Sequence, residues 1–97
     1  TARLELAIFG KVSKPALSSG GRTWTFDVDL KSGDRLYCKD GVNWRAVDAK
    51  RKMFASGRFS EPLPTLDGGE SVFRFSSADD GAAAARIEMV KRYEKRK

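Results

Sequence analysis

The chain contains no histidine and a single cysteine, Cys38, and these two shortages exclude several kinds of chemistry. Histidine is the commonest general base near neutral pH and a frequent zinc ligand, so the usual serine triads and most zinc sites are excluded. One cysteine cannot form a disulfide within the chain. We therefore expect Cys38 to be a small buried strand residue, and we expect a non-enzymatic protein without a cofactor or metal.

Long apolar runs are also missing. No segment approaches the roughly 18 apolar residues that a membrane-spanning helix needs, and the first residues lack the charged and then apolar pattern of a signal peptide. We expect no membrane partner and a cytoplasmic location. The 97 residues, 40% of them hydrophobic and 33% charged, predict a single domain over residues 1–97 with one core, and residues 94–97 are expected to form a frayed basic tail.

The clearest pattern that is present lies at residues 23–30, TWTFDVDL. Its apolar residues alternate with threonine and aspartate, which is typical of a strand with one buried and one wet face. Turn-forming residues bound it at both ends, so neighbouring strands can fold back on it. We predict that it is the central strand, with Trp24, Phe26, Val28 and Leu30 in the core.

Similar patterns predict further strands at residues 3–12, 35–39, 42–47, 53–60 and 71–76. Gly10 interrupts the first of them and indicates a bulge or sharp bend. Asp40 and Gly41 form the dipeptide typical of a two-residue hairpin turn. Residues 13–22 are rich in serine and glycine and predict a mobile connection, and residues 61–70 predict a protruding loop.

The end of the chain suggests a helix over residues 80–93. Asp79 and Asp80 are typical helix caps, and Ala83, Ile87 and Val90 share one helical face. The predicted fold is therefore α+β and mainly β. It is a small curled antiparallel sheet or barrel of five to six strands with a C-terminal α-helix, and an oligonucleotide-binding barrel is one member of that class.

The net charge of +6 is unevenly distributed. Residues 45–58 and residues 86–97 each carry +4, which leaves −2 for the rest of the chain. Aromatic residues lie beside these and other cations, as Tyr37 does between Arg35 and Lys39, and exposed rings between cations suit the stacking of unpaired bases. The candidate nucleic-acid-binding residues are Arg35, Tyr37, Lys39, Trp44, Arg45, Lys50, Arg51, Lys52, Arg58, Arg74, Lys91, Arg92, Lys95 and Arg96.

The function expected from these features is nucleic-acid binding, to single-stranded DNA or RNA rather than to a duplex. Two alternatives remain open. The same basic surface fits a small adaptor or inhibitor that binds an acidic surface of another protein. Asp27 and Asp29, on the wet face of one strand, fit a magnesium-dependent nuclease if a lysine lies nearby, although aspartate and threonine also simply solvate such a face.

Overall fold

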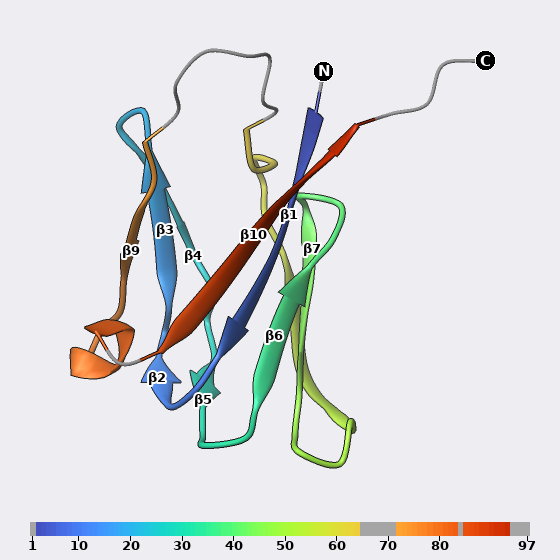
Figure 1. Ribbon diagram of the computed structural model, residues 1–97, viewed down its shortest axis with the longest axis vertical. Coiled ribbons are helices and arrows are strands. Elements are labelled where there is room, and N and C mark those ends of the chain that lie inside the picture. Colours follow the sequence, from blue (N-terminus) through green and yellow to red (C-terminus); the bar gives the residue numbers. More distant parts are fainter. Residues whose placement is uncertain (1, 65–71, 84, 94–97) are drawn as a thin grey trace.

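The computed structural model describes residues 2–64, 72–83 and 85–93, and these residues form three antiparallel sheets (Figure 1). The largest sheet has five strands in the order β10-β1-β6-β7-β8. Its strands are β1 (Ala2–Phe9), β6 (Arg35–Cys38), β7 (Asn43–Val47), β8 (Met53–Arg58) and β10 (Arg86–Tyr93).

Two smaller sheets form the other layer of the molecule. Three strands pair in the order β4-β3-β9, and β2 pairs with β5. These strands are β2 (Val12–Ser13), β3 (Ala16–Ser19), β4 (Arg22–Thr25), β5 (Asp29–Leu30) and β9 (Arg74–Ser76). The predicted bend at Gly10 is confirmed, because its φ of 115° turns the chain from β1 into β2.

The apolar faces of both layers meet in one core. Leu6, Ile8 and Leu36 cover it from the large sheet, while Leu17 and Phe26 cover it from the other layer, all of them 3% exposed or less. Cys38 is fully buried in this core, as expected. Burial raises the pKa of its thiol to about 11, so the thiol stays protonated at neutral pH.

The alternation predicted for residues 23–30 is confirmed, but the central position is wrong. Trp24, Phe26, Val28 and Leu30 are all buried, and the residues between them are exposed. However, among the described strands β4 lies at the edge of its sheet, and β5 pairs with β2 alone. The alternation reports which face is buried and does not report how many neighbours the strand has, which explains the error.

The hairpin between β6 and β7 is confirmed, with a longer turn than predicted. Cys38 pairs with Trp44, so five residues lie between the paired positions, and Asp40 and Gly41 are among them. The Asp40 carboxylate accepts hydrogen bonds from the backbone N–H groups of Val42 and Asn43 at 2.8 and 2.7 Å and from the Asn43 side chain at 2.8 Å. These bonds fix the loop that joins the two strands.

The predicted C-terminal helix is replaced by other structure. Residues Asp80–Ala83 form a short 3₁₀ turn, η1, and β10 then pairs with β1 along its whole length, from Phe9 opposite Arg86 to Ala2 opposite Tyr93. Ile87 packs against the core. Pairing with β1 satisfies the backbone of residues 86–93 and brings Ile87 to the core, and this tertiary contact overrides the local helix preference.

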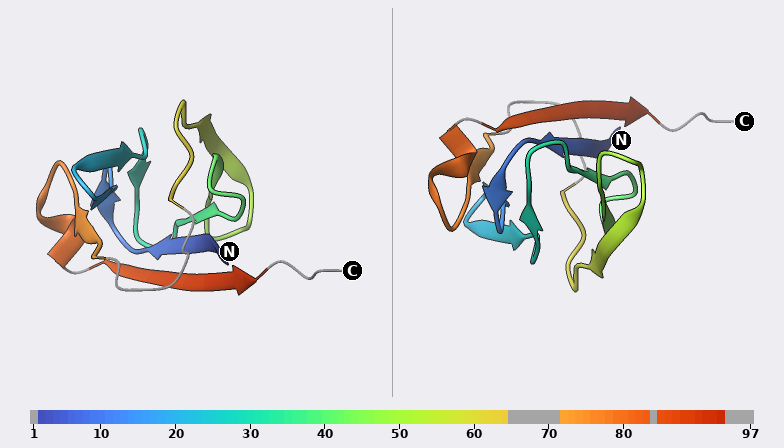
Figure 2. Two further views of the ribbon diagram at one scale, coloured as in Figure 1. Left: turned by 90° about the horizontal axis from the view of Figure 1, so that it is seen from above. Right: turned by 90° about the horizontal axis from the view of Figure 1, so that it is seen from below.

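The sheets do not close into a barrel. Viewed along its length, the chain forms a U whose base is β1 and β10 (Figure 2). At the open side, the Trp24 indole N–H on β4 donates to the carbonyl of Glu61 at 2.9 Å, and Leu63 adds a buried side chain.

The mobile connection predicted over residues 13–22 is wrong in part, because strand β3 forms within it.

Within the described ranges, no helix is long and apolar enough to cross a membrane. The residues of the predicted loop 61–70 are described only as far as residue 64, and the predicted tail 94–97 lies outside the described residues.

Candidate nucleic-acid interface

The face of the five-stranded sheet that points away from the core carries a group of rings and cations. Residues opposite one another on antiparallel strands share a face. Phe9 lies opposite Arg35 on one side and Arg86 on the other, and Tyr37 lies opposite Arg45. We call this side of the sheet the outer face. Antiparallel pairing therefore collects on one surface residues that are far apart in the sequence.

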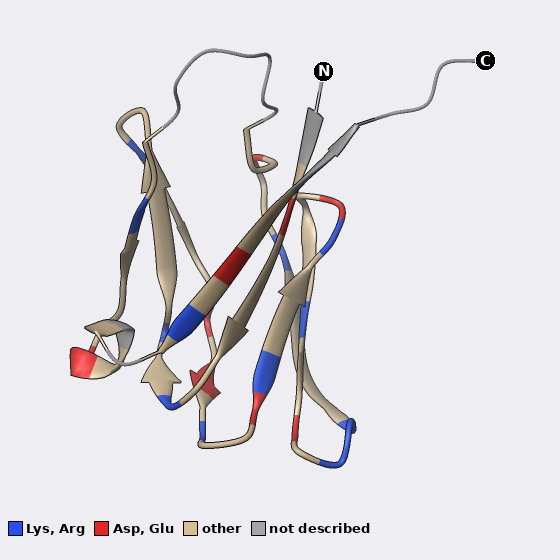
Figure 3. Cartoon of the chain, in the orientation of Figure 1, with Lys and Arg blue, Asp and Glu red and all other residues tan. Residues whose placement is uncertain are grey.

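Four cations of the outer face surround one shallow groove beside Tyr37. The groove has a volume of about 470 Å³, and Val47 and Met53 form its apolar part. No carboxylate lines it, and within the described part of the chain none of the four cations forms an ion pair. Figure 3 shows the cations on β6 and β7 and in the turn between β7 and β8, with acidic residues in the adjoining loops. The four cations are Arg35, Lys39, Arg45 and Arg51.

Arg51 reaches the groove from the tight turn between β7 and β8. Its φ of 66° lies in the left-handed region, and its N–H donates to the Asp48 carbonyl at 2.9 Å. The Asp48 carboxylate accepts the N–H groups of Lys50 and Lys52 at 2.8 and 2.9 Å. Asp48 thereby organises the turn, and Lys50 and Lys52 are exposed in it.

Two rings of the outer face contact each other at right angles. The ring centroids of Phe9 and Tyr37 are 6.4 Å apart with an interplanar angle of 90°. The Arg86 guanidinium lies 4.6 Å from the Phe9 centroid, and the Lys39 ammonium lies 5.9 Å from that of Tyr37. Both are cation–π distances.

Sequence reasoning missed Phe9 and Arg86. It placed the interruption of the first predicted strand at Gly10, beside Phe9, and a helix at Arg86. Extending the alternation of residues 3–7 by one step would have placed the Phe9 ring on the polar face, where an aromatic residue is unusual. The sequence around Arg86 holds no such signal, because the place of Arg86 beside Phe9 depends on the pairing of β10 with β1.

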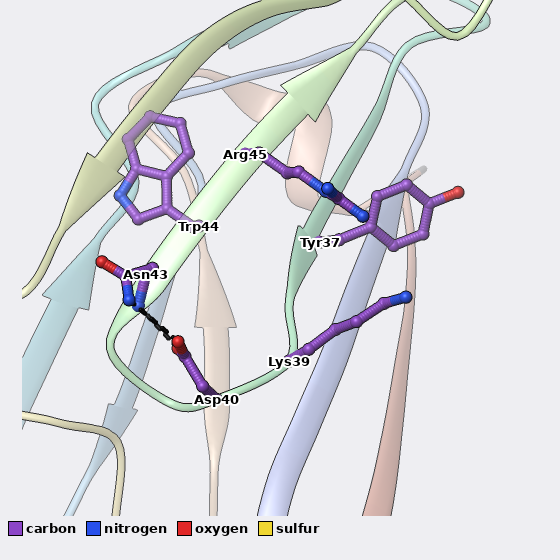
Figure 4. Close-up of a pocket in the computed structure, with 6 residues that line it drawn as sticks. All are labelled: Tyr37, Lys39, Asp40, Asn43, Trp44 and Arg45. Atoms are coloured by element: carbon purple, nitrogen blue, oxygen red, sulfur yellow. Dashed lines mark hydrogen bonds between the residues drawn. The ribbon is translucent and has the colours of Figure 1, made fainter.

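Trp44 lines a pocket beside this surface, but its indole points to the core side of β7, so it is not an exposed stacking ring. Figure 4 shows its indole on one side of β7, and Tyr37, Lys39 and Arg45 on the other. Trp44 is 6% exposed, meets Phe26 edge to face at a centroid distance of 5.9 Å, and lies flat against Gly57. In the sequence Trp44 precedes Arg45, and neighbouring strand residues point to opposite faces, so the ring is in the core.

The remaining predicted site residues are spread more widely. Arg58 is exposed on β8 opposite Asn43, near the loop of the hairpin. Arg74 is exposed on β9 in the other layer. Lys91 and Arg92 are strand residues of β10, opposite Leu4 and Arg3. Lys95 and Arg96 lie outside the described residues.

The structure also bears on the metal-dependent alternative. Asp29 accepts a hydrogen bond from the Ser13 hydroxyl, and Asp27 is exposed. Among residues 2–64, 72–83 and 85–93, no three Asp, Glu or Cys side chains are grouped so that they could hold a metal ion. The two aspartates thus lie on the outside of the smaller layer without a third acidic ligand there.

Comparison of the chain with protein-family models, with curated proteins and with solved structures finds no match.

Proposed function

We propose that the chain binds single-stranded nucleic acid on the outer face of the five-stranded sheet. The observation that carries the proposal is the groove that Tyr37 lines together with Arg35, Lys39, Arg45 and Arg51, none of which is ion-paired to an acidic residue of the described ranges. Four cations that line one groove repel one another, and a polyanion bound there removes that repulsion. In the proposed complex they contact successive phosphates.

The rings supply the second part of the interaction. A base stacked on an aromatic side chain contributes roughly 1 to 3 kcal/mol, whatever its identity. The Arg86 guanidinium lies closer to the Phe9 centroid, at 4.6 Å, than the Lys39 ammonium does to that of Tyr37, at 5.9 Å. We therefore assign the stacking role to Tyr37, with Phe9 in edge contact beside it. Arg45 lies directly across the strand pair from Tyr37, which brings a phosphate contact next to the stacked base.

A single strand fits this surface better than a duplex. Reading a duplex through the major groove commonly uses a helix, and in the described part of the chain the only helical segment is the four-residue turn η1. Unpaired bases, in contrast, present the faces that Tyr37 can stack on.

The proposal is tested by anisotropy titrations of a labelled oligonucleotide at two salt concentrations. Tyr37→Ala should weaken binding by roughly 1 to 3 kcal/mol, and Tyr37→Phe should retain it, because the ring and not the hydroxyl stacks. Arg45→Gln should also lower the salt slope by about 0.7. Arg74→Gln is the matched control, since it removes an exposed arginine from the other layer.

The same titrations separate the proposal from its rival. A protein adaptor would bind oligonucleotides through charge alone, so its affinity would fall steeply with salt and ignore Tyr37→Ala. Equal losses for Arg45→Gln and Arg74→Gln, with no effect of Tyr37→Ala, would contradict the proposed site. Met53, 62% exposed at the edge of the groove, would then be a natural contact for a protein partner.

A further inference from the structure

We propose that a second copy of this chain pairs with the outer edge of β10, so that two five-stranded sheets join across a two-fold axis at Val90. This inference is independent of the proposed function, because it concerns an edge of the sheet and not the cationic groove on its face. It comes from the contrast between the two edge strands of the sheet, β8 and β10.

The two edges differ in how well they resist pairing with another strand. The register of β8 shifts beside Met53, and Gly57 lies within the strand, and such irregular edges discourage pairing with a further strand. In contrast, β10 pairs with β1 over eight consecutive residues without a shift, and it contains neither proline nor glycine. Within the described ranges β10 has β1 as its one strand partner, so its other edge is a template for a further strand.

The middle of β10 is apolar and exposed on both faces of the sheet. Met89 is 37% exposed and Val90 is 46% exposed, and neighbouring residues of a strand point to opposite faces. A body that docks on one face of the sheet would cover only one of these two side chains. A strand added beside β10 would bring side chains next to both of them, so the exposure fits strand addition.

The sequence of β10 is complementary to itself in one antiparallel register. Residues that lie opposite one another must share a face, so two copies of β10 pair with residues that are an even number of positions apart. When the pairing is centred on Val90, Glu88 of each copy lies opposite Arg92 of the other, and opposite charges meet twice. Centred on Met89, it would place Arg86 opposite Arg92, and like charges would repel. The charges of this edge therefore fit a second copy in the register centred on Val90.

Glu88 keeps its present ion pair in this arrangement. Its carboxylate is 3.7 Å from the Arg86 guanidinium, and its side chain is 49% exposed. A carboxylate accepts several hydrogen bonds, so position 92 of the second copy adds a cation without displacing Arg86. Exposed ion pairs contribute little to affinity, and here they select the register, while backbone hydrogen bonds and the contacts of Met89 and Val90 hold the strands together.

The test is sedimentation equilibrium of the protein without nucleic acid, at concentrations up to about 1 mM. We expect a weak dimer with a dissociation constant of about 0.1 to 1 mM, because one strand pair buries less than a stable interface does. Glu88→Lys and Arg92→Glu should each weaken the dimer about tenfold, since like charges then meet twice. The double variant exchanges the two charges and should restore the parent dissociation constant. Asp27→Lys, which makes the same change in net charge on the other layer, should leave dimerisation unchanged.

Three outcomes would overturn the inference. A protein that stays monomeric over the whole concentration range has no such interface. A dimer that is indifferent to Glu88→Lys and Arg92→Glu forms through another surface. Single variants that weaken the dimer without restoration in the double variant would contradict the register centred on Val90. Circular dichroism of each variant shows that it is folded, and the oligonucleotide titrations test the proposed function separately.

Discussion

At the scale of single residues, the contact between Trp44 and Gly57 determines which side of the hairpin faces the core. A methyl group added at Gly57 would lie 2.5 Å from atoms of the indole ring, closer than van der Waals contact permits. The missing side chain of Gly57 therefore leaves the space that the ring occupies. Because Trp44 takes this inner place, Arg45 and Tyr37 take the outer one.

The first prediction follows from this contact. Gly57→Ala should destabilise the protein by about 1 to 3 kcal/mol, because the ring must shift within a packed core. Urea unfolding followed by circular dichroism measures the loss. Ser56→Ala, one residue earlier on the outer face, is the control and should change stability by less than about 0.5 kcal/mol. Equal stabilities for the two variants would show that Trp44 is not packed on Gly57.

The second prediction concerns Asp40 in the hairpin loop. Its hydrogen bonds with the side chain and backbone of Asn43 and the backbone of Val42 lower the pKa of the carboxyl from 3.8 to about 2. The folded state thus holds the proton less tightly than the unfolded state. The resulting stabilisation is present above pH 3.8 and is lost as the pH falls to about 2.

Urea unfolding at several pH values between 2 and 5 checks this linkage. Asp40→Ala should reduce the fall in stability across that window and should lower stability at neutral pH, because the loop loses its acceptor. An unchanged pH dependence in the variant would mean that other carboxyl groups cause the acid sensitivity.

At the scale of elements, the sequence predicted best where a strand's own alternation decides the outcome. The burial of Trp24, Phe26, Val28 and Leu30 could be predicted because burial depends on local period alone. The secondary structure after residue 79 could not be predicted in this way. The same alanines and aspartates that favour a helix are overridden by pairing with β1, almost eighty residues earlier in the chain, and no local pattern reports that contact.

The third prediction distinguishes strand from helix at this end of the chain. In a helix, Gly81→Ala would stabilise the protein by about 0.5 to 1 kcal/mol. In the observed fold, the added methyl would lie 2.5 Å from the Lys11 carbonyl oxygen and 2.7 Å from the Val12 Cα atom. We therefore expect a loss of about 1 to 3 kcal/mol in chemical unfolding. A gain in stability would favour the helix.

At the scale of the whole molecule, the candidate site depends on which residues of distant strands lie opposite one another in the five-stranded sheet. The sequence indicated that Tyr37 and its neighbouring cations belong together, because they share one short strand and the loop beside it. It could not indicate that Phe9 and Arg86 join them, or that Arg74 lies in the other layer, since both depend on how distant strands pair. Trp44 was assigned to the site together with Arg45, although neighbouring residues of one strand point to opposite faces.

The most direct test of the central claim is to map the bound surface. Amide NMR shifts of the isotope-labelled protein should be recorded while a single-stranded oligonucleotide is added. The largest changes should fall on the outer face, at Ala7, Tyr37 and Arg45, while Ser18 and Arg74 in the other layer should change little. Changes concentrated on β3, β4 and β9, or none at all at low salt, would contradict the account.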